Sequence, residues 1–398
     1  MMTNNILVIA EKAPQYDGGN GTQKLLYTSY VNMPDVNFLI INDEKKKVSL
    51  DNWTHFFSLK SDGIVNKKKC RYSNFIDSFS SKQERFEISD KYFYQLKELI
   101  DKIIKKRKID LVIFEQSGML MWSWYRALPS NIKGVLRIHD SHYLYFFSDL
   151  KLRKNIMSKI ALMGFAFAQK HYEKANISNW DQVQFVSTKE SEFYESRFPK
   201  VKTKIIYTPT SIMYGKNEYL HNLEKTIDIL FVGTMTWKPN TDAVYWFLKE
   251  VLPLIRRALP GVSMRIVGKD ADTKISYQGK NVEIFGFVDS LEEIYKTTYL
   301  AINPSQSGGG VKVKLMEYAS FGIPIVTTSN GIAGFTEDIK KALFVYDDAE
   351  SFSRAVMDLL QDNQLRIDYS NKIFNYTKQH FDKNKNQKIW LKEIEKII

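Results

Sequence analysis

The sequence has little of what disulfides, metal clusters and membrane spans are built from. Its 398 residues include one cysteine, Cys70, which excludes an intramolecular disulfide and a metal site built from cysteines. The longest apolar run, residues 160–168, is far too short to cross a bilayer. The first apolar run, residues 6–10, lacks the flanking features of a signal peptide, so we expect a buried strand there. These absences predict a protein of the reducing cytoplasm.

Acidic residues are outnumbered by basic ones, 45 against 57, which gives a net charge of +12. A basic protein can bind nucleic acid, an anionic membrane or acidic substrates. The sequence has no zinc-finger spacing, no RNA-recognition motif and no basic tail, so nucleic acid is not an expected partner. Basic and apolar residues are mixed over residues 150–174. That mixture fits an amphipathic helix on an anionic membrane surface or a core helix with a solvated basic edge.

Short apolar runs alternate with helical patterns, which predicts α/β domains with parallel sheets covered on both faces. In the first half, strands are expected at 6–10, 37–41, 111–114, 134–138 and 184–186, and helices at 21–31, 91–106 and 155–175. In the second half, strands are expected at 228–232, 263–267, 282–285, 299–302, 324–328 and 342–345, and helices at 241–259, 291–297, 313–321 and 349–360. Residues 43–90 are polar and poorly periodic, which indicates an insertion.

This rhythm divides the chain into two doubly wound domains. An N-terminal domain is expected over residues 1–208 and a C-terminal domain over 226–378, with a linker at 209–225 where the rhythm is lost. A last helix at 379–398, after a break near Phe381, is expected to cross back to the N-terminal domain. Because ligands of open α/β sheets bind at the carboxyl ends of the strands, we expect the site in a cleft between the two sheets.

A glycine-rich loop at 308–310 is the most informative segment, because it follows an apolar run and precedes a helical pattern. There, free N–H groups and the helix dipole favour an anion, and Lys312 adds a full charge. At 3.6 residues per turn, Gly310, Lys314 and Glu317 share one helix face. Phosphate binders beside a carboxylate suited to a ribose diol predict a nucleoside-diphosphate ligand. The alternative is a flexible loop before a solvated helix.

A second glycine cluster, Gly18-Gly19-Asn20-Gly21, follows the first expected strand and precedes a helix. Two glycine-rich helix starts that face one cleft suit a diphosphate. The alternative is an ordinary tight turn.

Four short motifs occur in order along the second half: Phe231-Val232-Gly233-Thr234-Met235-Thr236-Trp237-Lys238-Pro239-Asn240, Ile266-Val267-Gly268, Phe285-Gly286-Phe287-Val288-Asp289, and residues 309–326. Their order and spacing resemble those of the retaining nucleotide-sugar glycosyltransferases with the GT-B fold, in particular glycosyltransferase family 4. In the first half, Arg137-Ile138-His139-Asp140 and Gly18-Gly19 also match. The resemblance implies two Rossmann-like domains that face an inter-domain cleft.

The resemblance also implies roles for individual residues. Glu317 would bind the ribose hydroxyls, Phe287 would frame the base, and His139 would lie near the donor sugar as a catalytic residue. Lys312 and Lys238 would act on the diphosphate as catalytic cations. The remaining donor-binding positions would be Gly18, Gly19, Asn20, Gly233, Gly309, Gly310, Val311 and Lys314.

The reaction implied by the resemblance is retaining sugar transfer from a nucleoside-diphosphate sugar to a saccharide hydroxyl, without a metal or other cofactor. The pair Asp270 and Asp272 is therefore interpreted as a solvated turn. The sequence departs from the family pattern at Gly309, where a first glutamate is common, and at Thr234, where many relatives have arginine. A basic first half favours a lipid-linked acceptor of surface-polysaccharide synthesis and a peripheral position on the inner face of the membrane. The alternatives are a protein O-glycosyltransferase and an inactive GT-B-like partner.

Overall fold

The computed structural model describes residues 5–15, 19, 21–31, 33, 35–41, 54–57, 90–116, 121–153, 155–213, 219 and 226–398. The chain forms two compact units. Unit 1 comprises Met1–Gln15, Ser29–Thr208 and Gln387–Ile398, and unit 2 comprises Tyr16–Thr28 and Pro209–Asn386. Most of the insertion predicted at 43–90 lies outside the described residues. In the part of the chain that is described, no helix is both long and apolar enough to span a membrane.

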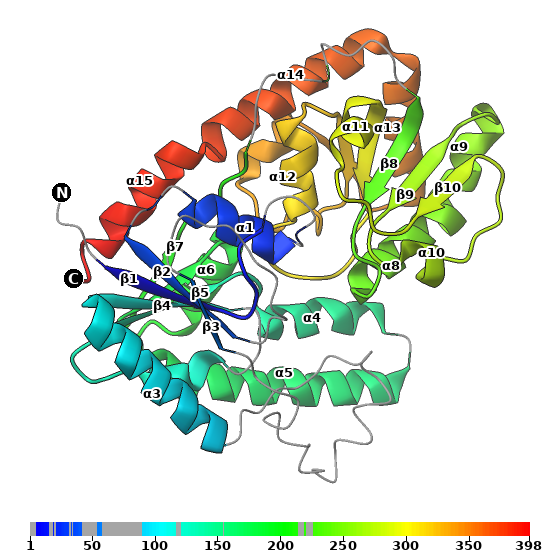
Figure 1. The fold of residues 1–398 in the computed structure, drawn as a ribbon. Helices are drawn as coiled ribbons and strands as arrows, with labels where there is room; N and C mark the ends of the chain where they lie inside the picture. The colour runs from blue at the N-terminus through cyan, green and yellow to red at the C-terminus, as the bar shows by residue number, and fades with distance from the viewer. Residues whose placement is uncertain are drawn as a thin grey trace. The chain divides into compact units, whose positions relative to one another are not determined.

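Unit 1 is built on a seven-stranded parallel sheet with the order β3-β2-β1-β4-β5-β6-β7 (Figure 1). Its strands are β1 (Ile6–Ala10), β2 (Val36–Ile41), β3 (Thr54–Phe57), β4 (Leu111–Gln116), β5 (Lys133–Ile138), β6 (Gln182–Phe185) and β7 (Lys204–Tyr207). The helices of unit 1 are α3 (Asp90–Arg107), the 3₁₀ helix η2 (Met121–Ala127), α4 (His142–Leu152), α5 (Ile156–Ile177) and α6 (Thr188–Arg197). Helix α1 (Gly21–Tyr30) belongs to unit 2 up to Thr28, and its last two residues belong to unit 1. Every residue of β1 and β2 is buried, as expected for strands covered on both faces.

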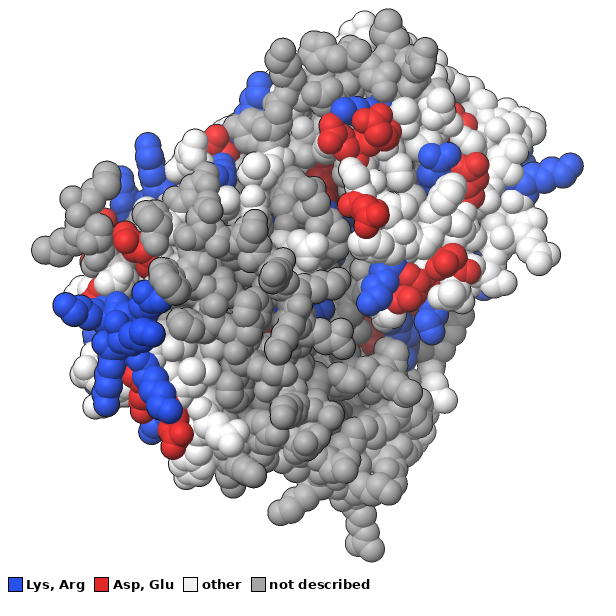
Figure 2. All heavy atoms as spheres, viewed as in Figure 1, with Lys and Arg blue, Asp and Glu red and all other residues white. Residues whose placement is uncertain are grey.

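The strand predicted at 6–10 is confirmed with its bounds, and the other strands and helices predicted for unit 1 are confirmed within two residues of theirs. The sequence did not predict α6, whose polar composition lacks a helical apolar stripe, or α4, whose aromatic residues hide its period. The basic and apolar segment at 150–174 is divided between α4 and α5, because the side chain of Asn155 caps a new helix there. Basic side chains gather over α3, where Lys105 and Lys106 are exposed (Figure 2).

Unit 2 is built on a six-stranded parallel sheet with the order β10-β9-β8-β11-β12-β13. Its strands are β8 (Ile227–Val232), β9 (Met264–Val267), β10 (Val282–Phe285), β11 (Thr298–Asn303), β12 (Ile325–Thr327) and β13 (Phe344–Val345). The helices after them are α8 (Lys238–Trp246), the π-helix η3 (Phe247–Val251), α9 (Leu252–Ala258), α10 (Ala271–Lys274), α11 (Glu292–Lys296), α12 (Val313–Ser320), the 3₁₀ helix η4 (Glu337–Lys341), α13 (Ala349–Gln361), α14 (Asn363–His380) and α15 (Lys383–Ile394), of which α15 is shared with unit 1.

The long helix predicted at 241–259 is three consecutive segments, α8, η3 and α9. Pro253 lies in the first turn of α9, where its missing N–H needs no partner, and a π-helical turn precedes it. The predicted break near Phe381 is confirmed, because α14 ends at His380 and α15 begins at Lys383.

The strand order of unit 2 reverses between β8 and β11, which are hydrogen-bonded neighbours. Connections from these two strands leave the sheet in opposite directions, so a crevice opens beyond their carboxyl ends. The segments that follow the two strands are 233–237 and 304–312. The fold therefore brings the first and last motifs of the second half together at one edge.

A buried polar chain joins α5 to α6 in unit 1. The carboxylate of Glu173 accepts hydrogen bonds from Gln169 Nε2 at 2.9 Å and from the Tyr194 hydroxyl at 2.5 Å. The Tyr194 hydroxyl also lies 2.8 Å from Ser141 Oγ. Burial raises the pKa of Glu173 to about 7, because desolvation disfavours the charged carboxylate more than these two donors favour it.

The raised pKa of Glu173 predicts a loss of stability as the pH rises. Its folded-state pKa lies above the ordinary value, so the protonated carboxyl contributes stability that is fully present below pH 4.5 and is lost as the pH passes 7. We expect the wild type to lose about 3 kcal/mol of unfolding free energy over this range relative to Glu173→Gln. Urea unfolding at several pH values measures this difference. The exposed Glu195 on α6 supplies the control, Glu195→Gln, and equal pH profiles for wild type and Glu173→Gln would contradict the prediction.

Candidate functional site

The candidate site lies where α8 and α12 begin, beside the β8–β11 reversal of unit 2. The residues before the two helices are Trp237 and Lys312, and within the described residues neither supplies a side-chain cap. The first-turn N–H groups of a helix need hydrogen-bond acceptors, and an anion can supply them. Two helix starts at one sheet edge also bring two positive dipole ends together. This arrangement suits an anionic ligand with more than one charge.

The glycine loop before α12 has a backbone that other residues adopt at a cost. Gly308 and Gly310 have φ angles of 99° and 63°, in the left-handed region. The loop is also backed closely by Gly334, where an added Cβ would lie 2.7 Å from the Gly310 carbonyl oxygen. Asn330 Nδ2 donates a hydrogen bond of 3.3 Å to the Gly308 carbonyl. The loop is therefore held in place by its neighbours, and its glycines are required by conformation and packing.

Lys314 connects the two helix starts. Its ammonium donates a hydrogen bond of 2.8 Å to Asn240 Oδ1 on α8 and lies 4.0 Å from the centre of the Phe231 ring. An added Cβ on Gly233 would lie 2.9 Å from the same ammonium, so the glycine leaves room for it. Burial, and then the nearby charge of Lys312, hold the pKa of Lys314 well below its ordinary value. A ligand with negative charge would relieve both effects.

Lys312 and Lys238, the two predicted catalytic cations, differ in their surroundings. The ammonium of Lys312 donates to the carbonyl of Gly309, so it lies against the glycine loop. An added Cβ on Gly308 would lie 3.2 Å from this ammonium. Lys238 instead pairs with Asp242 one turn along α8, and its side chain is 40% exposed. In this structure Lys312 lies against the glycine loop, whereas Lys238 is paired within its own helix.

Glu317, the predicted ribose ligand, forms an ion pair with Lys24 of α1. Both side chains belong to unit 2 and are only 11% and 12% exposed. The helices approach closely, since an added Cβ on Gly21 would lie 3.2 Å from Val313 Cγ2. Lys24 is not among the site residues predicted from the sequence. The feature that could have indicated it is the three-residue spacing from Gly21, the last residue of the second glycine cluster, because that spacing places both residues on one helix face.

The loops after β9 and β10 complete this edge of unit 2. An added Cβ on Gly268 would lie 2.1 Å from the Gly233 carbonyl oxygen, so these turns are in backbone contact. Phe287, predicted to frame the base, has 56% of its surface exposed. Asp272 lies against Gly286, where an added Cβ would meet its Oδ2 at 2.9 Å. Among the described residues, no group of three or more His, Cys, Asp or Glu side chains is placed to hold a metal ion.

His139 lies in unit 1, directly after β5. Its Nε2 bonds to Glu115, which also accepts hydrogen bonds from Tyr30 and from Arg137 Nη1 at 3.3 Å. Although burial opposes it, the positive charge of Arg137 and the contact with His139 lower the pKa of Glu115 to about 2. A buried carboxylate therefore orients the imidazole, an arrangement common to structural and catalytic histidines. Its Nδ1 is buried and has no hydrogen-bond partner among the described residues.

The second glycine cluster is described only in part. Gly18 and Asn20 lie outside the described residues, and Gly19 is half-buried between them. The predicted roles of these three residues, and of Gly309 and Val311 as amide donors, stay predictions.

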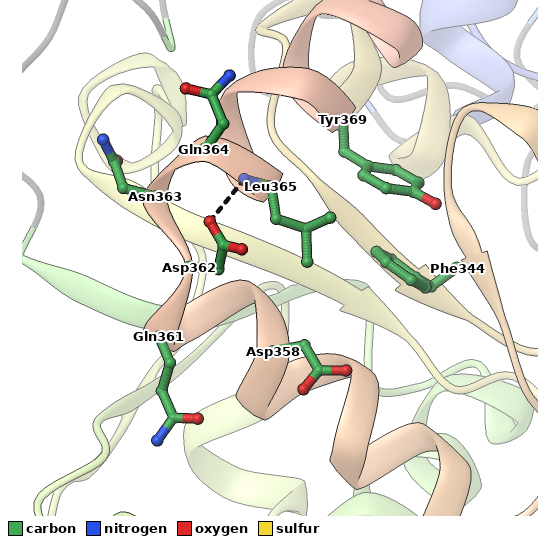
Figure 3. A pocket seen from close by; sticks show the side chains of 8 residues that line it. All are labelled: Phe344, Asp358, Gln361, Asp362, Asn363, Gln364, Leu365 and Tyr369. Atoms are coloured by element: carbon green, nitrogen blue, oxygen red, sulfur yellow. Dashed lines mark hydrogen bonds between the residues drawn. The ribbon is translucent and has the colours of Figure 1, made fainter.

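A hollow of about 930 Å³ lies elsewhere in unit 2, between the end of α13 and the start of α14 (Figure 3). Phe344 and Tyr369 stack in it with ring centres 4.3 Å apart, and Asp362 Oδ1 accepts a hydrogen bond of 2.9 Å from Leu365 N (Figure 3). Phe344 is the first residue of β13, so the hollow lies toward the amino end of that strand. Its acidic and amide lining does not resemble an anion site.

A family comparison agrees with the position of the candidate site. The family described as glycosyl transferases group 1 matches residues 226–362, which lie within unit 2. A curated protein of Klebsiella pneumoniae, described as an uncharacterized 44.6 kDa protein in the cps region, is 24% identical over 296 residues, which are 70% of this chain and 72% of that protein.

Solved structures share the fold of the whole chain. The match with TarM of S. aureus covers 98% of this chain and 99% of the TarM chain, with a TM-score of 0.66 and 11% identity. Anabaena HepE gives a TM-score of 0.62, 11% identity and the same coverage. WaaG, a glycosyltransferase involved in lipopolysaccharide biosynthesis, gives a TM-score of 0.59 and 12% identity, and the match covers 96% of this chain and 99% of the WaaG chain. These likenesses confirm the predicted GT-B fold of two Rossmann-like units. With the family match, they support a GT-B glycosyltransferase.

The buried state of Lys314 predicts a pH effect on stability. The folded-state pKa of Lys314 is depressed, so the unfolded chain binds a proton that the folded chain binds less well. Stability should therefore rise with pH up to the ordinary lysine pKa of about 10.4. We expect the unfolding free energy of the wild type to increase relative to Lys314→Met from neutral to alkaline pH, measured by urea unfolding. The control is Lys238→Met, at a lysine whose side chain is 40% exposed. A difference between the wild type and Lys314→Met that does not change with pH would contradict the prediction.

Proposed function

We propose that this protein is a retaining glycosyltransferase that moves a sugar from a nucleoside-diphosphate sugar to a hydroxyl of a saccharide acceptor. The observation that carries the proposal is the arrangement around α12 in unit 2. Lys312 precedes the helix beside a glycine loop, Lys314 lies on its first turn, and Glu317 follows one turn later. The cations suit a diphosphate and the carboxylate suits a ribose diol.

In the proposed reaction, negative charge builds on the β-phosphate as the bond to the sugar breaks. The first turns of α8 and α12, with Lys312 and Lys314, would stabilise this charge. The acceptor hydroxyl is the nucleophile: its oxygen bonds to the anomeric carbon on the face from which the diphosphate leaves, which retains the configuration. The hydroxyl proton passes to the departing phosphate oxygen. We infer that basic side chains and helix dipoles neutralise the leaving group and that no metal is required. His139, held by Glu115, is the proposed contact to the sugar.

The proposed acceptor class rests on the similar proteins. The S. aureus TarM structure contains UDP and α-GlcNAc-glycerol, and the Anabaena HepE structure contains UDP and glucose. The Klebsiella relative belongs to a cps region, and WaaG takes part in lipopolysaccharide biosynthesis. These descriptions support a saccharide acceptor in surface-polysaccharide synthesis, and we propose that it is lipid-linked and used on the inner face of the membrane.

A panel of UDP-, GDP- and dTDP-sugars, with and without a chelator, tests the donor. One donor at a hundred times its dissociation constant should stabilise the protein by about 2.7 kcal/mol, seen as a thermal shift. We expect the shift to survive chelation and to disappear in Glu317→Ala. NMR of the glycoside product determines whether the anomeric configuration is retained. A protein that responds to no donor would favour the inactive GT-B-like partner instead.

Removal of the Lys312 ammonium should mainly slow the chemical step. A preorganised donor at the leaving group is worth on the order of a hundred- to a thousandfold in kcat, so Lys312→Ala should lose that much. Steady-state release of the nucleoside diphosphate measures the loss. Lys296→Ala is the matched control, since Lys296 is an α11 lysine paired with Glu292. A loss of only a few-fold in Lys312→Ala would contradict the proposed role.

A further inference from the structure

Helix α5 of unit 1 carries an exposed apolar stripe. Five of the 13 large apolar side chains that are exposed in the described part of the chain lie on this one helix: Ile156, Met157, Ile160, Met163 and Phe167. Four of them follow the spacing i, i+4, i+7 and i+11, which places them on one helix face. Ile160 is 57% exposed and Phe167 62% exposed. A continuous apolar face in water is costly unless something covers it.

The opposite face of α5 is already used by the protein. Ser158, Ala166, Gln169, Glu173 and Ile177 are buried, and α4 packs along the helix (Figure 1). Phe165 stacks on Phe146 of α4 with ring centres 5.7 Å apart. The exposed stripe is therefore the outer face of a helix that is anchored by its inner face.

The charges around the stripe are of one sign. Lys159 and Lys170 are half-buried along one border of the stripe, and Lys174 is exposed at its end. The only acidic residue of α5 is Glu173, which is buried and hydrogen-bonded on the inner face. An apolar stripe bordered by lysines is complementary to a surface that offers acyl chains below anionic head groups.

We propose that α5 lies in the plane of an anionic bilayer surface, with Ile156, Ile160, Met163 and Phe167 inserted among the acyl chains. Lys159, Lys170 and Lys174 then contact the lipid phosphates. The helix cannot span the membrane, since no described helix is long and apolar enough to do so. This docking does not depend on the proposed transfer reaction, because it concerns only the surface of unit 1.

Sedimentation of the full chain with vesicles tests the proposal without any sugar donor. The vesicles contain phosphatidylcholine alone, or phosphatidylcholine with phosphatidylglycerol, at physiological salt. The wild type should bind the anionic vesicles, and Ile160→Gln/Phe167→Gln should bind them roughly tenfold less or weaker. Tyr94→Gln/Ile389→Gln is the matched control, because Tyr94 and Ile389 are exposed apolar residues outside α5. Equal binding of the α5 variant and the wild type would overturn the proposal.

A second pair of variants separates docking by α5 from general attraction of a basic protein. Lys159→Glu/Lys170→Glu should weaken binding by at least about fivefold per lysine. Lys105→Glu/Lys106→Glu makes the same charge change on α3, where basic side chains also gather (Figure 2), and should weaken binding less. If both pairs weaken binding equally, the attraction is general and the assignment to α5 is wrong.

The melting temperature and the molecular mass of the protein in solution show whether protein covers the stripe. If α5 faces solvent in the absence of lipid, Ile160→Gln/Phe167→Gln should leave the Tm unchanged within about 1 °C. A clear drop in the Tm, or a dimer in sedimentation velocity that this variant abolishes, would mean that protein covers the stripe. Either result would overturn the lipid proposal.

Discussion

The candidate site depends on the burial of one ammonium group, that of Lys314, between the starts of two helices. A buried cation is unfavourable unless it is hydrogen-bonded and compensated by negative charge. Asn240 supplies a hydrogen bond and the Phe231 ring an electrostatic contact, but both are neutral. Glu317, one turn along the helix, raises the pKa of Lys314 without restoring it. The geometry is therefore better suited to the protein with an anion than to the protein alone.

Several small residues around the site follow from that burial. A side chain at Gly233 would occupy the place of the Lys314 ammonium, and one at Gly268 would collide with the Gly233 backbone. Asn240 is fixed because its amide nitrogen also donates a hydrogen bond of 2.9 Å to the Thr234 carbonyl. Thr234 thus contributes its backbone carbonyl to the position of Asn240. Contacts of Lys314 therefore link the first and last motifs of the second half, and the second motif packs on the first at Gly233.

The sequence predicted the sheets well because parallel, doubly covered strands are continuous apolar runs, as in β1, whose five residues are all buried. It also predicted that the glycine loop at 308–310 follows a strand, and the structure confirms this, because β11 ends at Asn303. It could not show that Lys238 turns to Asp242, because local propensity does not decide between a ligand and an i+4 partner. Nor could it reveal that His139 is held by Glu115, since that contact depends on the pairing of β4 with β5.

The pairing of Lys24 with Glu317 gives Gly21 a role that the motif alone does not suggest. A carboxylate as buried as Glu317 needs a cation or several donors nearby. Lys24 reaches it only because α1 approaches α12 closely at Gly21, where a side chain would press on Val313. If the proposed nucleotide donates its ribose hydroxyls to Glu317, Lys24 can remain as the opposite charge beside the buried carboxylate. The glycine and the lysine three residues later thus maintain the acceptor that the proposed nucleotide needs.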